Sequence, residues 1–408
     1  MGFYKQTFKG ISWLGALRLI TRAFTIVRLA ILARLLTPGE FGIFGIATLV
    51  LAFLEIVTET GINVFFIQDE GKLDEYLNTA YVLSIIRGIL ISIFIIIITP
   101  FVAKFFNTEG SQPLLYFIAL IPFIRGFINP SSVKFQKELE FNKEFYFRTA
   151  IFFADSLVAI TTAFLLRSAS SLVWGMIAGV IVEVLVSQLF IKPRPKFIFA
   201  FNKVKKVLDR GKWVTVSSIL QYLFSNTDNS IVGKLMDSSY LGYYQMAYKI
   251  STLPITEISN VFYNVTFPVF SKFQNDKERL RRAFLKSTLA ITLISVPLGL
   301  VIYIFAKEIV LIVLGNEWMP VVAPLKILSI YGILRAVTAE IPAVFMALKR
   351  QEWVMIVTLV AVFGIGITMV PFVKLYGIIG ASYSSLIGVG FGLLPMIYYL
   401  HKLLWKNE

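Results

Sequence analysis

Long apolar blocks, separated by short polar segments, dominate the chain. The clearest blocks cover residues 85–99, 151–166, 174–191, 289–304 and 354–373. Each block, together with its mildly polar flanks, reaches the roughly 20 residues that a helix needs to cross a bilayer. The blocks are continuous and do not alternate between apolar and polar positions, as the strands of a membrane barrel would. The pattern therefore predicts an all-α polytopic membrane protein.

We predict about twelve transmembrane helices from this pattern. Their approximate ranges are 10–36, 41–67, 76–98, 113–130, 146–167, 171–192, 211–236, 240–267, 283–305, 321–347, 353–374 and 378–400. The first, second, seventh and eighth ranges contain more polar groups than the others. Because lipid cannot satisfy such groups, we expect these four helices to face a wet interior.

The composition agrees with lipid as the main solvent of this chain. Hydrophobic residues make up 57% of the sequence and charged residues only 15%. Soluble domains have roughly 45–50% apolar and about 25% charged residues. A soluble core could not bury so large an apolar share.

Residue types that enzymes often use for catalysis are scarce. The chain has no cysteine, and its single histidine, His401, lies in the polar C-terminal segment. A catalytic triad or a histidine-ligated metal site would need a histidine at membrane depth. The nucleotide-binding pattern G-x-x-x-x-G-K-[ST] is also absent from the sequence. We therefore expect no catalytic residue, no metal site and no cofactor, and hence a protein that is not an enzyme.

Lysine and arginine residues are distributed unevenly between the two sides of the predicted membrane. If the N-terminus is cytoplasmic, the cytoplasmic segments contain 25 of them and the outer segments contain 6. Such an excess marks the cytoplasmic face, so we predict an inner-membrane protein with both termini in the cytoplasm. The same distribution explains the net charge of +15. Because the basic residues are spread over separate loops, we expect membrane lipid as a partner and no nucleic acid.

The two halves of the sequence resemble each other at an offset of 200 residues. Residues 34–47 (RLLTPGEFGIFGIA) and 234–247 (KLMDSSYLGYYQMA) share a cation, two apolar residues, a polar turn and a following Gly and Ala. Trp13 and Trp213 keep the same offset. Each half has six predicted spans, which is an even number. The halves should therefore insert with the same orientation.

This repeat predicts the domain organisation. We expect an N-terminal six-helix lobe over 1–192, a basic cytoplasmic linker over 193–210 and a C-terminal six-helix lobe over 211–408. Two like-oriented lobes around a central cavity are the architecture of an alternating-access transporter. A static scaffold produced by gene duplication is the alternative interpretation.

Several arginines fall inside predicted spans, where a charge is costly and usually faces a cavity. Three of them lie within an arc of about 120° on the first span: Arg18, Arg22 and Arg28. The third, fourth and tenth spans contain Arg87, Arg125 and Arg335. A guanidinium stays charged and binds phosphate at two points, which favours a cavity for a large anion. The alternatives are ion pairs that lock neighbouring helices, or side chains that extend toward the headgroups.

Acidic residues at membrane depth could couple transport to an ion or could pair with the arginines. They are Glu55, Glu59, Asp155, Glu183, Asp228, Glu257 and Glu340. Asp228 lies in the polar run 225–230 (SNTDNS), which must line water or a ligand because lipid cannot satisfy it. We therefore prefer Asp228 as the ion-coupling residue, with Glu55 and Glu59 as further candidates for coupling or for helix pairing.

Residues 33–42 (ARLLTPGEFG), followed by Gly61 and residues 65–68 (FFIQ), resemble the polysaccharide transporter family. That family belongs to the multidrug/oligosaccharidyl-lipid/polysaccharide exporter superfamily, and the resemblance covers essentially the whole chain. It implies two six-helix lobes and a cationic central cavity. The activity it implies is the flipping of lipid-linked oligosaccharides, carried on a polyprenyl pyrophosphate, from the cytoplasmic to the outer leaflet. Many members have fourteen spans, two more than we predict here.

The leading hypothesis is therefore a flippase for cell-surface polysaccharide biosynthesis that works by alternating access. Its pyrophosphate would be bound by Arg18, Arg22, Arg28, Arg125 and Arg335. Besides the lipid-linked oligosaccharide, we expect enzymes of glycan assembly as partners. An ion-coupled drug or metabolite exporter of the same superfamily is the alternative, but it should favour an acidic cavity. A membrane glycan polymerase or ligase would need a large polar outer loop, whereas every predicted outer connection is short.

Overall fold

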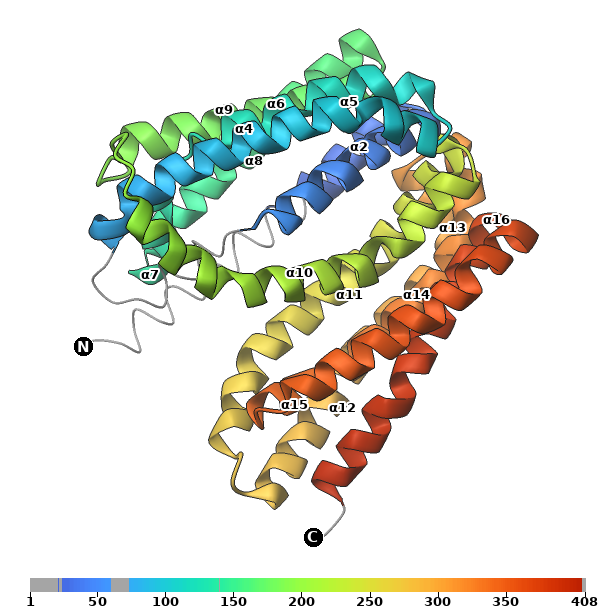
Figure 1. The fold of residues 1–408 in the computed structure, drawn as a ribbon. Coiled ribbons are helices and arrows are strands. Elements are labelled where there is room, and N and C mark those ends of the chain that lie inside the picture. The colour runs from blue at the N-terminus through green and yellow to red at the C-terminus, as the bar shows by residue number, and fades with distance from the viewer. Residues whose placement is uncertain (1–20, 22–23, 60–72, 139, 406–408) are drawn as a thin grey trace. The chain divides into compact units, whose positions relative to one another are not determined.

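The computed structural model describes residues 21, 24–59, 73–138 and 140–405. Within these residues every regular element is a helix (Figure 1), as the apolar blocks predict. The chain forms two compact units, Met1–Tyr222 and Leu223–Glu408. The division falls inside one long helix, α10 (Phe201–Leu235). The predicted lobes 1–192 and 211–408, with a linker over 193–210, remain a prediction.

Among the described residues of the N-terminal unit, a helix covers residues 24–35. Its further elements, in chain order, are α2 (Pro38–Val57), α4 (Leu73–Phe105), η1 (Glu109–Ser111), α5 (Gln112–Ile118), α6 (Leu120–Arg125), η2 (Pro130–Val133), α7 (Lys134–Lys137), α8 (Phe141–Leu166) and α9 (Ser170–Phe190). Helices α8 and α9 pack along each other, and α6 packs against both α4 and α9.

The C-terminal unit continues from α10 in the same way. Its elements are α11 (Ser238–Lys272), α12 (Lys277–Ile304), α13 (Ala306–Val313), η3 (Asn316–Val321), α14 (Val322–Thr338), α15 (Glu340–Ala347) and α16 (Gln351–Leu404). Helix α14 packs against α11, α12 and α16. Helix α16 consists of two helices that meet at Gly377, where φ is 60°.

Seven helical stretches of the described residues are long and apolar enough to cross a membrane. One of them is α16, which supplies two spans. Four further predicted spans correspond to the helix at 24–35, to the consecutive helices α5 and α6, and to the more polar helices α10 and α11. Each of the twelve predicted spans thus contains a described helix, although parts of the first two ranges lie outside the described residues, and the predicted all-α polytopic membrane fold is confirmed.

Helix starts repeat between the two units at the offset seen in the sequence. Helix α2 follows the cap residue Thr37, and α11 follows Asp237. Both cap side chains accept a hydrogen bond from a backbone N–H of the first turn. Those N–H groups have no partner inside the helix, so a Thr or Asp oxygen stabilises the start. The repeated residues 34–47 and 234–247 therefore encode the same local structure.

Later in each unit the offset becomes 210 residues. Helices α5 and α14 begin at Gln112 and Val322, and α8 and α16 begin at Phe141 and Gln351. The residues that separate the last two helices of each unit also match. Arg167 and Gly377 both have positive φ, 47° and 60°. The halves share one fold, with a ten-residue insertion in the second.

Each unit has its own apolar core. In the N-terminal unit α2, α4, α5 and α9 bury side chains such as Leu51, Ile95 and Leu115. In the C-terminal unit α11, α12, α15 and α16 bury Phe270 and Phe345, among others. Many large apolar side chains instead face outward, as expected for helices whose surroundings are lipid.

Candidate functional site

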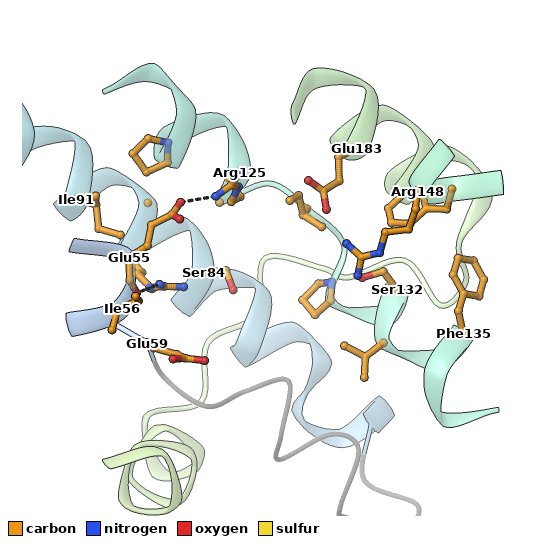
Figure 2. Close-up of a pocket in the computed structure, with 18 of the residues that line it drawn as sticks. Glu55, Ile56, Glu59, Ser84, Ile91, Arg125, Ser132, Phe135, Arg148 and Glu183 are labelled. Carbon is orange, nitrogen blue, oxygen red and sulfur yellow. Dashed lines mark hydrogen bonds and ion pairs between the residues drawn. The ribbon is translucent and has the colours of Figure 1, made fainter. Parts of the chain in front are cut away.

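The N-terminal unit contains a cavity of about 500 Å³ (Figure 2). Helices α2, α4, α6, α8 and α9 and the turn η2 contribute its walls. The charged lining residues are Arg87, Arg125, Arg148, Glu55, Glu59, Glu144 and Glu183. Three arginines and four glutamates give the lining both signs of charge. The cations that line this cavity are therefore balanced by carboxylates.

Two glycines allow α4 and α6 to meet at this cavity. A Cβ on Gly88 would lie 2.4 Å from the carbonyl oxygen of Pro122, and one on Gly126 would lie 3.0 Å from the backbone of α4. Small residues let membrane helices approach closely. Because Arg87 precedes Gly88 and Arg125 precedes Gly126, this close approach brings the two arginines to one region.

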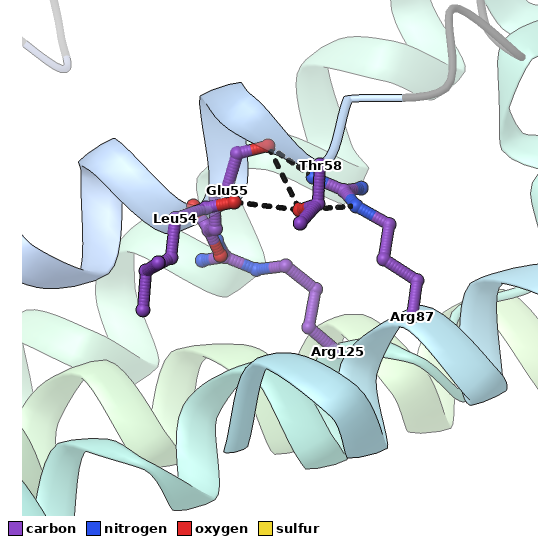
Figure 3. A network of polar contacts seen from close by, with 5 residues as sticks. All are labelled: Leu54, Glu55, Thr58, Arg87 and Arg125. Carbon is purple, nitrogen blue, oxygen red and sulfur yellow. Dashed lines mark hydrogen bonds and ion pairs between the residues drawn. The ribbon is translucent and has the colours of Figure 1, made fainter. Parts of the chain in front are cut away.

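Both arginines bind the C-terminal turn of α2 (Figure 3). Arg125 Nη1 lies 2.5 Å from Glu55 Oε1. Arg87 donates through Nη2 to the Glu55 carbonyl at 2.5 Å and through Nε to Thr58 Oγ1 at 3.1 Å. The last carbonyls of a helix have no partner within it, so arginine side chains stabilise this end. The arrangement matches the helix-locking alternative for Arg87 and the pairing alternative for Glu55.

A second charged group lies across the cavity. The Glu183 side chain points between Arg125 and Arg148 (Figure 2). Arg148 Nε also lies 3.6 Å from Glu144 Oε1, one turn earlier on α8. The side chains of Arg125 and Arg148 are 39% and 52% exposed, so both can reach a ligand. The sequence did not point to Arg148 as a site residue. Its neighbours Arg125 and Glu183 come from α6 and α9, and no sequence spacing connects them with α8.

Another arginine of this unit, Arg28, is held by a carboxylate outside the cavity lining. Arg28 donates to both oxygens of Asp155, at 2.6 and 2.8 Å. A Cβ on Gly175 would lie 2.6 Å from an Asp155 carboxyl oxygen, so a glycine is needed where α9 passes this pair. The arrangement matches the ion-pair alternative for Arg28. Arg18 and Arg22 lie outside the described residues.

Asp228 lies in a buried polar cluster of the C-terminal unit. Its side chain is 4% exposed, and Oδ2 accepts a hydrogen bond from the Tyr244 hydroxyl at 2.8 Å. The same hydroxyl lies 3.0 Å from Ser385 Oγ. Oδ1 accepts from the backbone N–H of Asn229 at 2.7 Å. Sequence reasoning found Asp228 through its polar run, but it missed Tyr244 and Ser385, which come from α11 and α16.

Arg335 is the arginine whose surroundings differ most from the others. It is half-buried, and Nη1 donates to the hydroxyls of Tyr248 and Tyr331, both at 3.1 Å. Its guanidinium carbon also lies 5.7 Å from the ring centres of Phe224 and Tyr331. Within the described part of the chain, these hydroxyl and aromatic contacts are its partners, and no carboxylate forms an ion pair with it.

Comparison with known protein families places this chain in one of them. A family model described as polysaccharide biosynthesis protein matches residues 31–323. The chain belongs to this family. The match confirms the resemblance that residues 33–42 indicated.

Two relatives of this protein match it over most of its length. The lipopolysaccharide biosynthesis protein WzxC of Escherichia coli is 25% identical over 354 residues, which are 86% of this chain and 72% of WzxC. The probable low-salt glycan biosynthesis flippase Agl15 of Haloferax volcanii is 23% identical over 382 residues, which are 90% of this chain and 78% of Agl15.

Solved structures show the same fold. The lipid II flippase MurJ, in an inward closed conformation, has a TM-score of 0.77 at 14% identity, covering 96% of this chain and 87% of MurJ. An inward-facing multidrug resistance MATE family transporter of the MOP superfamily has a TM-score of 0.71 at 15% identity, covering 97% and 98%. At these identities the likeness shows the fold alone, and it assigns no site residue.

Proposed function

We propose that this protein is a flippase, not an enzyme, that moves a lipid-linked oligosaccharide from the cytoplasmic to the outer leaflet. The family match supports a role in polysaccharide biosynthesis, and the name of Agl15 supports flipping as the step. The protein works in the inner membrane with both termini in the cytoplasm. Enzymes of glycan assembly are its partners, since they make the substrate and consume the product.

The observation that carries the proposal is the state of Arg335. A guanidinium at membrane depth is costly unless it is satisfied. The two tyrosine hydroxyls bind one nitrogen, and no carboxylate among the described residues contacts the guanidinium directly, although Asp228 acts on its charge from a greater distance. A pyrophosphate can bind the planar guanidinium directly, at two points.

Further ligands of the pyrophosphate are the other arginines predicted from the sequence. They are Arg18, Arg22, Arg28 and Arg125. In this structure Arg28 and Arg125 bind Asp155 and Glu55, so each would exchange a carboxylate for a phosphate oxygen. The sugars occupy the wet interior while the lipid tail stays in the bilayer. The site opens alternately to the two sides, and ion coupling is assigned to Asp228, with Glu55 and Glu59 as secondary candidates.

A drug or metabolite exporter is the second candidate function. The four glutamates that line the N-terminal cavity favour it, since carboxylates bind organic cations. An exporter of this kind would move cationic dyes and would not discriminate between lipids with and without a pyrophosphate.

The experiment uses purified protein in proteoliposomes that contain a fluorescent polyprenyl-pyrophosphate oligosaccharide. Arg335→Gln removes the charge and keeps a polar side chain, and we expect translocation to slow by about tenfold or more, because a charge-assisted hydrogen bond contributes roughly 1.5–3 kcal/mol. Lys326→Gln is the matched control on the same helix, since Lys326 contacts the Tyr303 ring and not Tyr248. Equal rates for both variants would contradict the role of Arg335. Transport of a cationic dye, with no movement of the lipid, would favour the exporter.

A further inference from the structure

Glu340 is a buried acid that the proposed transport site does not use. It is the first residue of α15, and its side chain is 0% exposed. Neither carboxyl oxygen has a hydrogen-bond partner among the described residues. Buried polar atoms almost always have such a partner, so a fully buried carboxyl without one calls for an explanation.

The polar groups beside this carboxyl are two hydroxyls, and each has a backbone carbonyl as a competing partner. The hydroxyls of Thr266 on α11 and Ser287 on α12 adjoin it. Each hydroxyl has one proton to donate. Thr266 donates it to the Phe262 carbonyl at 2.9 Å, and Ser287 donates it to the Phe284 carbonyl at 3.0 Å. A hydroxyl that donates to its backbone carbonyl offers Glu340 only lone pairs, and it must rotate away from that carbonyl to donate to an ionised carboxylate.

Charged side chains on the helices around α15 do not compensate the acid either. On α12, Arg282 pairs with Glu278, Arg279 with Asp276, and Arg281 lies over the Trp405 ring. On α14, Arg335 binds two tyrosines. On α16, Glu352 pairs with Arg350. None of the remaining charged side chains on these helices forms an ion pair with Glu340. They are Lys249, Glu257 and Lys272 on α11, Lys277 and Lys286 on α12, Lys326 on α14, and Lys374, His401 and Lys402 on α16.

An ionised carboxylate in such a place would be far more costly than a neutral one. A buried charge without a partner typically neutralises by exchanging a proton. The protonated acid has an O–H group that can donate to Thr266 or Ser287, so the neutral form also suits the acceptors around it. A metal ion would need about six oxygen ligands, and the described residues contain no group of three acidic or histidine side chains.

We propose that Glu340 is a proton-binding site of the C-terminal unit. It holds a proton in the conformation described here and releases it to water in another conformation. The O–H bond of the carboxylic acid then breaks, the proton passes to water, and a hydrated carboxylate remains. The inference rests on the proposed function, since it makes the proton an ion that the transport cycle uses.

The local backbone lacks one helical hydrogen bond beside Glu340, while Ala339 keeps helical angles of φ −61° and ψ −26°. Helix α14 ends at Thr338 and α15 begins at Glu340. Pro342 has no N–H to donate to the Thr338 carbonyl, which explains the break. Along α12, unpartnered buried polar atoms recur every seven residues, at Arg281 Nε, Thr288 Oγ1 and Ser295 Oγ. A seven-residue period keeps them on one helix face, so α12 has a polar face along its length.

The direct test is infrared spectroscopy of the full-length protein in lipid nanodiscs. We expect the wild type at neutral pH to show the carbonyl band of a protonated carboxylic acid. Glu340→Gln should remove that contribution, and Glu257→Gln, a matched change on α11, should retain it. An unchanged band in Glu340→Gln would overturn the proposal, because it would mean that Glu340 is ionised.

Translocation in proteoliposomes then tests coupling. An imposed pH gradient should accelerate lipid translocation by the wild type and by Glu257→Gln, and should accelerate Glu340→Gln less, because its amide imitates the protonated acid while Asp228 is intact. A response of Glu340→Gln equal to that of the wild type would overturn coupling through this site. If the wild type moves no lipid at all, the proposed function fails, and the infrared result still decides whether Glu340 binds a proton.

Discussion

Two arginines at membrane depth are held by carboxylates from distant parts of the chain. Arg28 binds Asp155, and Arg125 binds Glu55. The sequence identifies the arginines, because a cation inside an apolar block is conspicuous. It cannot identify their partners, since 127 residues separate Arg28 from Asp155 and no local pattern connects them. The role of each arginine therefore depends on tertiary structure.

The Arg28–Asp155 pair provides a prediction at this scale. Arg28→Ala and Asp155→Ala should each lower the melting temperature in detergent, because each leaves one charge unpaired. The side chains are 17% and 20% exposed, so the loss should lie between the ~1 kcal/mol of a surface pair and the ~3 kcal/mol of a buried pair. The double variant should lose less than the sum of the two single variants. Simple additivity would show that the pair contributes no coupling energy.

At the scale of elements, the sequence predicted where helices lie better than where they break. The predicted range 113–130 contains two helices, α5 and α6, which separate at Ala119. Pro122 cannot donate a hydrogen bond to the Ile118 carbonyl, so the helix is interrupted four residues before the proline. The same rule explains the break before Pro342. A hydropathy pattern does not contain this information, because both sides of a break are equally apolar.

The glycines between α4 and α6 give the prediction for this scale. Gly88→Ala should separate the helices, since its Cβ would lie 2.4 Å from a backbone oxygen, and it should destabilise the protein by about 1–3 kcal/mol. Gly366→Ala in α16 is the control, because a Cβ there meets nothing within 4 Å. Thermal unfolding of both variants in detergent measures the difference. Equal melting temperatures would mean that α4 and α6 do not pack as described.

At the scale of the whole molecule, two halves with one fold differ in their polar chemistry. The N-terminal unit pairs arginines with carboxylates, whereas the C-terminal unit joins Asp228 and Arg335 to tyrosines. Gly175 and Ser385 show the difference at one equivalent position, 210 residues apart. Gly175 makes room for the Asp155 carboxyl, and Ser385 contacts the Tyr244 hydroxyl. The repeat could be predicted from the sequence because both helix starts use the same capping chemistry. The polar difference between the halves could be predicted for Asp228, but not for its partners Tyr244 and Ser385, which lie on other helices.

The central claim is that this protein moves a lipid-linked oligosaccharide across the bilayer. The most direct measurement reconstitutes the wild type into liposomes with a fluorescent polyprenyl-pyrophosphate oligosaccharide and adds a membrane-impermeant quencher. Without protein, only the outer-leaflet lipid is quenched. We predict that the protein makes the inner-leaflet lipid accessible as well, and that the same lipid without its pyrophosphate stays protected. Quenching equal to that of protein-free liposomes would contradict the account.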